Sequence, residues 1–306
     1  MPKLEGRVIA RGLGFPEGPV ALPDGGVLVV EIATGRLVRV APDGELEIAA
    51  HLGGGPNGAA IGPDGRCYVC NNGGFKWRTD DGFTRPIGEA LDYKGGSIQR
   101  VNLADGEFET LYTHCDGHPL YGPNDIVFDA HGGFWFTDFG KKFADRIMNG
   151  GVFYARTDGS FIRRAAYPFL TPNGIGLSPD GRTLYVAETE TSRLWSYPVT
   201  RPGELALEPF PSPNGGRLVH GLPGYQRFDS LAVEENGNVC VATLVRGGIS
   251  VFSPRGELLE FHEAPEGYCT NICFGGPDMR TAYITLSGYG QLFEARWPRR
   301  GLKLAA

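Results

Sequence analysis

The segment that decides the fold is Thr-Pro-Asn-Gly-Ile-Gly-Leu-Ser-Pro-Asp-Gly, residues 171–181. Its asparagine, Asn173, is followed by a short apolar run and, seven positions later, by the Asp-Gly pair at 180–181. Asp-Gly favours a tight β-hairpin turn, because glycine readily takes the positive φ that such a turn needs. The apolar residues 183–187 after the turn then form the returning strand. The segment therefore predicts two antiparallel strands, with Asn173 where the chain enters the first.

The same pattern recurs six times along the chain of 306 residues. Each copy places a turn residue seven positions after an acidic or amide residue. The pairs are Glu17 and Asp24, Asn57 and Asp64, Asn124 and His131, Asn173 and Asp180, Asp229 and Asn236, and Asn271 and Asp278. In five copies the next residue is glycine, and Met279 is the exception. A repeat of about 51 residues made of short strands is typical of a β-propeller blade.

Further strands complete each repeat. Apolar second strands are expected at 27–30, 67–70, 134–137, 183–187, 239–243 and 282–285, and third strands at 36–40, 97–102, 152–156, 193–199, 249–252 and 291–296. Five repeats also offer a fourth strand, whereas the sixth runs out of chain, and residues 7–11 can supply its missing strand. We therefore predict an all-β protein, a six-bladed β-propeller with four antiparallel strands per blade, closed by the N-terminal strand and forming a single domain over residues 1–306. A β-sandwich would need neither the fixed offset nor the leftover strand.

Composition supports this reading and excludes several partners. The 47 glycines and 23 prolines are about twice as dense as in an average chain, which argues against helical bundles and α/β barrels. A net charge of −6 gives no basic footprint for nucleic acid. No stretch has the apolar length of a signal peptide or a membrane span, so we expect a cytoplasmic protein that does not bind membranes. The six cysteines are expected to be free thiols, and the sequence does not indicate an oligomeric state.

The six acidic or amide residues of the repeats should surround the central channel, because the first strand of each propeller blade is the innermost. A single asparagine or aspartate before a strand is usually only a turn former. Six such residues at one register instead favour a ring of oxygen ligands. Carboxylate and amide oxygens without histidine or cysteine suit one divalent metal ion, calcium above all, with magnesium, manganese, iron or zinc as alternatives. A tetrahedral structural zinc site is disfavoured because no suitable Cys/His set is present.

Four long insertions, at 72–96, 112–123, 139–150 and 211–228, should rim the channel on the same face. Their aromatic residues include Phe75, Trp77, Tyr93, Tyr121, Phe143, Tyr225 and Phe228. These side chains either contact a substrate of low polarity or simply pack the loops. Two histidines of the second insertion, His114 and His118, are candidates for acid/base or substrate contacts, with capping of the loop as the alternative. No nucleophile elbow surrounds Ser178, Ser230 or Ser253, which argues against a serine hydrolase.

Residues 7–297 resemble the senescence-marker-protein, gluconolactonase and luciferin-regenerating-enzyme family of propeller lactonases. The motifs that carry the resemblance are Phe-Pro-Glu-Gly-Pro at 15–19, Gly-Pro-Asn-Asp at 122–125, the 171–181 segment and Cys-Phe-Gly-Gly-Pro-Asp at 273–278. The resemblance implies that Glu17, Asn173 and Asp229 are metal ligands and that Asn124 completes the metal or substrate shell. It also implies that Asp229 is the catalytic carboxylate, which activates water or attacks directly. Asn57 and Asn271 remain candidates for substrate contacts.

Two positions depart from the pattern of sugar lactonases. Gly122 stands where those proteins usually carry arginine, and Phe228-Asp229-Ser230 replaces the usual Pro-Asp-Gly. The expected reaction is therefore metal-dependent opening of a lactone or ester less polar than a sugar lactone, with Trp77, Tyr121 and Phe228 contacting the substrate. A phosphotriester hydrolase would use nearly the same ring of ligands. A non-catalytic binding propeller is disfavoured, because carboxylates facing a channel are costly without a cation. A strictosidine-synthase-like propeller needs a catalytic glutamate that we do not find here.

Overall fold

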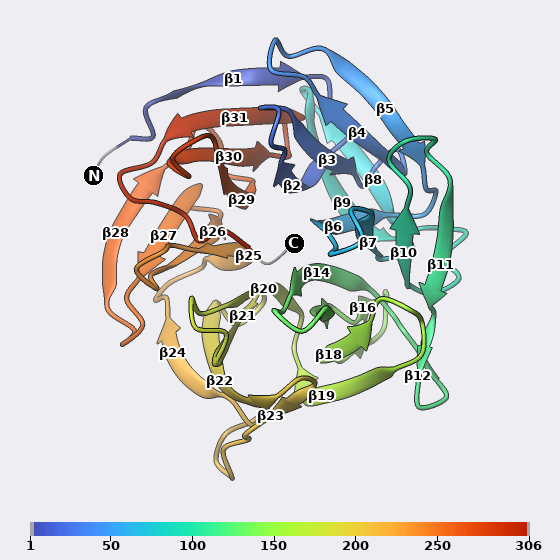
Figure 1. The fold of residues 1–306 in the computed structure, drawn as a ribbon, viewed down its shortest axis with the longest axis vertical. Coiled ribbons are helices and arrows are strands. Elements are labelled where there is room, and N and C mark those ends of the chain that lie inside the picture. Colours follow the sequence, from blue (N-terminus) through green and yellow to red (C-terminus); the bar gives the residue numbers. More distant parts are fainter. Residues whose placement is uncertain (1–2, 305–306) are drawn as a thin grey trace.

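Six antiparallel sheets surround a central axis in the computed structural model, which describes residues 3–304 (Figure 1). Within this described range the chain forms strands, bridges, turns and bends but no helix, and hence no helix that could span a membrane. Each sheet has a core of four strands, with the first strand of each unit nearest the axis (Figure 1). The predicted six-bladed β-propeller is confirmed.

The first three blades follow the predicted repeats. Blade 1 contains β2 (Pro16–Ala21), β3 (Val27–Glu31), β4 (Arg36–Val40) and β5 (Leu46–His51). Blade 2 contains β6 (Pro56–Ile61), β7 (Cys67–Asn71), β10 (Ser97–Val101) and β11 (Phe108–Tyr112). Blade 3 contains β14 (Pro123–Phe128), β15 (Gly133–Asp138), β18 (Gly150–Arg156) and β19 (Ile162–Phe169).

The remaining blades complete the circle. Blade 4 contains β20 (Pro172–Leu177), β21 (Thr183–Glu188), β22 (Arg193–Arg201) and β24 (Arg217–Gly221), with the short β23 (Glu204–Leu205) also paired to β22. Blade 5 contains β25 (Arg227–Val233), β26 (Val239–Leu244), β27 (Gly248–Phe252) and β28 (Leu258–Glu263). Blade 6 contains β29 (Cys269–Gly275), β30 (Thr281–Leu286), β31 (Gln291–Arg296) and β1 (Gly6–Arg11).

Segments near both ends of the described chain connect blade 6 to the rest of the ring. Strand β1 pairs antiparallel with β31, from Gly6 opposite Ala295 to Arg11 opposite Gln291, so the N-terminal strand closes the ring as predicted. After β31 the chain crosses to blade 5, where the carboxylate of Glu234, fully buried, accepts hydrogen bonds from Trp297 Nε1 at 2.7 Å and Arg299 Nε at 2.6 Å. A buried carboxylate is tolerated here because charged and neutral donors satisfy it.

Apolar side chains between neighbouring blades form the core. The second strands are the most deeply buried, and every residue of β15 and β26 is buried. Between blades 2 and 3 the rings of Tyr68, Phe128 and Phe134 pack with centroids 5.1 to 5.6 Å apart. All six cysteines are free, and five of them are buried in this interior. Burial of large side chains from both faces of each blade holds the radial arrangement together.

The predicted hairpin turns take the conformation that the Asp-Gly signal requires. The five glycines at 25, 65, 132, 181 and 237 have φ between +69° and +91°. The exception, Met279, adopts the same left-handed conformation with φ of +56° despite its side chain. All six blades therefore share the same left-handed turn conformation. Glycine adopts it without the steric strain that a side chain adds.

Three of the insertions form short hairpins. They are β8 (Phe75–Asp80) with β9 (Phe83–Glu89), β12 (His114–Cys115) with β13 (His118–Pro119), and β16 (Lys141–Lys142) with β17 (Ile147–Met148). The first hairpin reaches blade 6, because the Phe83 ring lies 5.1 Å from both Tyr268 and Tyr289 and the Thr84 N–H donates to the Gly288 carbonyl at 2.8 Å. It therefore spans part of the central opening.

Replacing Gly181 by alanine should destabilise the protein by about 1 kcal/mol, because a Cβ at positive φ is strained even though no atom lies within 4 Å of it. Chemical denaturation measures the difference. The control is Gly221→Ala, at an exposed strand end where φ is not positive and the new Cβ makes only ordinary contacts. Equal stability of the two variants would contradict the assignment of Gly181 to a turn that requires glycine.

Candidate active site

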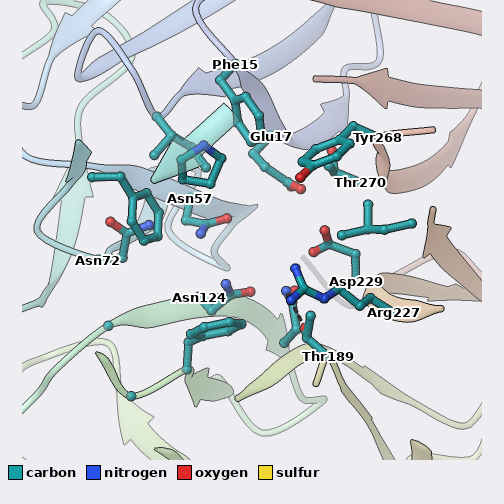
Figure 2. A pocket seen from close by; sticks show the side chains of 18 of the residues that line it. Phe15, Glu17, Asn57, Asn72, Asn124, Thr189, Arg227, Asp229, Tyr268 and Thr270 are labelled. Carbon is teal, nitrogen blue, oxygen red and sulfur yellow. Dashed lines mark hydrogen bonds between the residues drawn. The ribbon is translucent and has the colours of Figure 1, made fainter. Parts of the chain in front are cut away.

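The first strands of five blades deliver polar side chains to one central cavity. Glu17, Asn57, Asn124, Asn173 and Asp229 line a space of about 160 Å³ on the axis of the ring. Figure 2 shows four of them, Glu17, Asn57, Asn124 and Asp229, pointing toward a common centre from different blades. All five are at most 9% exposed. The cavity is thus a polar centre enclosed by the apolar blades.

A break in strand register accompanies every member of the predicted ring. In blades 2 to 5 the pairing shifts across the ring residue itself, between the residue before it and the second residue after it. In blade 1 the shift follows the ring residue, between Glu17 and Val20, and in blade 6 it precedes the ring residue, between Cys269 and Asn271. A bulge at this point turns the local backbone and re-aims the side chain, which a regular strand would direct along the sheet normal. The repeated bulge explains how one sequence register produces one ring of inward-facing oxygens.

Asn271, the sixth member of the ring, lies behind Glu17 and is not part of the lining. Its Nδ2 donates to Glu17 Oε2 at 2.7 Å, and the Gly18 N–H donates to the same oxygen at 2.7 Å. Asn271 Oδ1 in turn accepts from the Ile272 N–H at 2.7 Å. The amide is therefore fixed by the backbone and holds the Glu17 carboxylate in place.

Three buried carboxyl groups share the centre, and sequence reasoning identified only Glu17 and Asp229. The third is Asp125, the last residue of the Gly-Pro-Asn-Asp motif, whose carboxylate accepts from the N–H groups of Ile126 at 2.9 Å and Ile175 at 3.4 Å. Burial, followed by repulsion from Glu17, raises the pKa of Asp125 to about 7. Burial raises the pKa of Glu17. Burial and, second, repulsion from the Glu17 carboxylate raise the pKa of Asp229. Without a cation these groups oppose one another's ionisation.

The donor set fits a hard divalent cation only if amide oxygens take part. Among residues 3–304, no three side chains of histidine, cysteine, aspartate or glutamate lie close enough to hold a metal ion by themselves. Asn124 Oδ1, however, is buried without a hydrogen-bond partner in a cavity that it lines. An orphaned buried acceptor next to two carboxylates is the environment that an oxygen-preferring cation would satisfy. The residues present therefore fit such an ion.

The predicted aromatic and histidine contacts are mostly set back from the cavity. Trp77 packs on Phe15, with ring centroids 4.9 Å apart, and it is Phe15 and Phe75 that line the space. Phe228 is fully buried against Phe252, in the core around blade 5. Tyr121 and His118 line a separate cavity of about 300 Å³, whereas His114 is exposed and lines neither. The structure thus gathers the ring of oxygens but not these side chains.

Two cationic side chains that were not predicted from the sequence, Arg227 and Lys141, also line the cavity. Arg227 Nη2 lies 3.1 Å from both carboxylate oxygens of Glu190, which also lines the cavity. Lys141, only 2% exposed, donates from Nζ to the carbonyls of Asn72 at 2.9 Å and Gly74 at 2.8 Å. Both cations belong to insertions predicted to rim the channel, and all four insertions contribute to the lining as expected.

The absence of a side chain at Gly122 has a steric cause. A Cβ there would lie 2.5 Å from the carbonyl oxygen of Gly140, which is closer than side chains tolerate. The Phe139 N–H donates to the Gly122 carbonyl at 2.8 Å, which ties the two insertions together. An arginine at this position would require the backbone to move, so the wall beside Asn124 is bare main chain.

Comparison with known proteins agrees with this arrangement. A sequence model described as the SMP-30/gluconolactonase/LRE-like region matches residues 15–288. The chain is 29% identical over 235 residues to lactonase drp35 of Staphylococcus epidermidis, a match that covers 76% of this chain but only 64% of that relative's length. The fold is similar to a gluconolactonase from Xanthomonas campestris (TM-score 0.73, 22% identity, 95% of this chain and 89% of the other). It is also similar to regucalcin, described as a calcium-binding protein, from Agrobacterium tumefaciens (0.74, 18%, 99% and 99%).

The raised pKa of Asp125 predicts how metal-free protein responds to pH. Between its ordinary value of 3.8 and about 7, the folded state binds more protons at this group than the unfolded state, so stability falls as pH rises through that window. We expect the melting temperature of chelator-treated protein to fall between about pH 4 and pH 7, and added calcium to restore it mainly at the higher pH. Differential scanning calorimetry measures both effects.

Asp125→Asn should weaken this pH dependence, with the raised pKa values of Glu17 and Asp229 sustaining the remainder, whereas Asp145→Asn, at an exposed position, should leave it as in the parent protein. A melting temperature that is constant or rising over the same range and indifferent to calcium would contradict the interpretation of the centre.

Proposed function

The chain belongs to the SMP-30/gluconolactonase/LRE-like family, and on this basis we propose that it is a divalent-metal-dependent lactonase. The observation that carries the proposal is the convergence of two carboxylates and three asparagine amides, from five blades, on one buried cavity. Such a centre is unstable as isolated negative charge and is stabilised by a cation. In the proposed hydrolysis, a cation would polarise the lactone carbonyl and a neighbouring carboxylate would activate water.

Four side chains would hold the ion: Glu17, Asn124, Asn173 and Asp229. Calcium suits a set made only of carboxylate and amide oxygens, and magnesium, manganese, iron or zinc are the alternatives. When bound, the ion would polarise the lactone carbonyl and stabilise the negative charge that develops on its oxygen. The hydrogen bond from Asn271 fixes the Glu17 carboxylate, so this ligand would be oriented before binding.

Asp229 supplies the proton transfer. Its carboxylate takes a proton from a water molecule as the water oxygen bonds to the acyl carbon, and the proton then passes to the ring oxygen as the acyl C–O bond breaks. The products are a carboxylic acid and an alcohol on one open chain. The alternative role, direct attack of the Asp229 carboxylate on the acyl carbon, would form an anhydride that water then cleaves.

The walls favour a lactone with fewer hydroxyl groups than a sugar lactone. Apolar and aromatic side chains of the lining, among them Phe15, Ile32, Phe75, Leu244 and Tyr268, stand beside its polar groups. No side chain at position 122 can hydrogen-bond sugar hydroxyls, because the close approach of Gly140 leaves no room for one. An apolar ring is desolvated at little cost against such walls.

Asp229→Asn should lower kcat for the best lactone by roughly 10²-fold to 10⁴-fold, because the amide cannot accept the proton from water. Proton release in a pH-stat measures turnover on sugar, aliphatic and aryl lactones and on one phosphotriester, each with chelator and with each candidate metal. The control is Asp92→Asn, an exposed position on the first insertion, which should keep the parent's activity.

The outcomes separate the candidate functions. Metal-dependent turnover of a lactone supports the proposal, and turnover of the phosphotriester alone would move the assignment to phosphotriester hydrolysis. An active Asp229→Asn variant would refute the catalytic role of this residue. No turnover of any substrate with any metal would leave a binding propeller as the better description.

A further inference from the structure

Lys141 is a buried cation without a carboxylate partner. Its ammonium group donates to two neutral carbonyls and lies 4.5 Å from the centroid of the Phe75 ring and 4.3 Å from that of Tyr93. No carboxylate of a described residue forms an ion pair with it, although Asp138 and Glu89 act on it through space. Asp138 already accepts three backbone N–H groups. Burying a charge is costly unless it is paired, so this position calls for an anion.

One donor of Lys141 is still available. An ammonium group has three N–H donors, and the carbonyls of Asn72 and Gly74 use two of them. Lys141 is among the residues that line the central cavity, so a ligand bound there lies next to this side chain. Arg227, the other cation of the lining, differs because the Glu190 carboxylate already neutralises it.

Asn72 places a second unused donor beside Lys141. Its side chain is 2% exposed, and its Oδ1 accepts from the Gly74 N–H at 2.8 Å, which fixes the orientation of the amide. The opposite end of that amide, Nδ2, is buried without a hydrogen-bond partner and belongs to the cavity lining. A fixed amide N–H and an ammonium N–H can only donate, so together they match a group that only accepts, such as a carboxylate.

The position of this wall relative to the catalytic centre defines the ligand. Figure 2 shows Asn72 on the side of the cavity away from Asp229. Resting on the proposed function, we propose that the substrate is a lactone that carries a carboxylate substituent, which Lys141 Nζ and Asn72 Nδ2 bind while the lactone carbonyl faces Asp229. The same lining includes Phe15, Phe75 and Leu244, which can pack on the lactone ring, and Gly122, beside Asn72, carries no side chain that would cover the approach to it.

A pair of matched substrates tests this assignment: γ-butyrolactone carrying a carboxylate at its γ-carbon, and the same ring carrying a methyl group there. The protein should prefer the carboxylate, measured as the ratio of the two kcat/KM values. Lys141→Met should lower this ratio by about tenfold to hundredfold, because one charged hydrogen bond is lost. Asn72→Asp, which keeps the acceptor for Gly74 and adds a negative charge, should lower it as well. The control is Lys142→Met, the same substitution at the exposed neighbouring residue, which should leave the ratio as in the parent.

A binding measurement separates failure of this proposal from failure of the proposed function. Calorimetric titration of the calcium-loaded protein with glutarate and with butyrate compares a two-ended with a one-ended carboxylate. We expect glutarate to bind about tenfold more tightly, and Lys141→Met to abolish the difference. If no lactone is hydrolysed but this difference is present, the carboxylate subsite stands and the lactonase assignment fails. If lactones are hydrolysed with equal preference and glutarate has no advantage, Lys141 only anchors the 72–74 turn and the proposal is overturned.

Discussion

Negative charge buried on the propeller axis is the constraint on which the rest of the site depends. Glu17, Asp125 and Asp229 all reside in a water-poor centre where each raises the cost of ionising the others. Hydrogen bonds fix two of these carboxyl groups. Asn271 Nδ2 and the Gly18 N–H donate to Glu17, and the Ile126 N–H donates to Asp125. The remaining acceptor capacity, including the orphaned Asn124 oxygen, is what a cation would use.

The six blades make this arrangement possible because they repeat one local solution. Each first strand breaks its register at or next to the ring residue, and in five blades that side chain lines the cavity. The blades themselves are held by apolar packing that is independent of the centre, such as the aromatic cluster around Phe134. The apolar packing between blades can therefore offset the cost of burying carboxyl groups at the centre.

The sequence predicts the architecture well because its signals are local and repeated. The offset between Asn173 and Asp180, copied six times, specifies the strands, the turns and the ring, and the leftover strand at residues 7–11 specifies closure. Contacts between distant segments were not predictable in this way. Asp125 follows Asn124 in a strand, and nothing local indicates that its buried carboxyl interacts with Glu17 and Asp229. Lys141 reads as an ordinary surface lysine until folding brings it to Asn72, and Phe228 reads as a rim aromatic although packing against Phe252 buries it.

Closure of the ring by the N-terminal strand also governs the order in which the chain can assemble. Residues 6–11 are synthesised long before their partners, residues 291–296. Until then β1 has no neighbour, and blade 6 exposes an unpaired edge of the kind that favours association between chains. Pairing across nearly the whole sequence is slow, because the ends of a long chain must first meet. The circular architecture therefore makes folding depend on the pairing of two strands that are far apart in the sequence, and loss of either strand would leave an unpaired sheet edge open to aggregation.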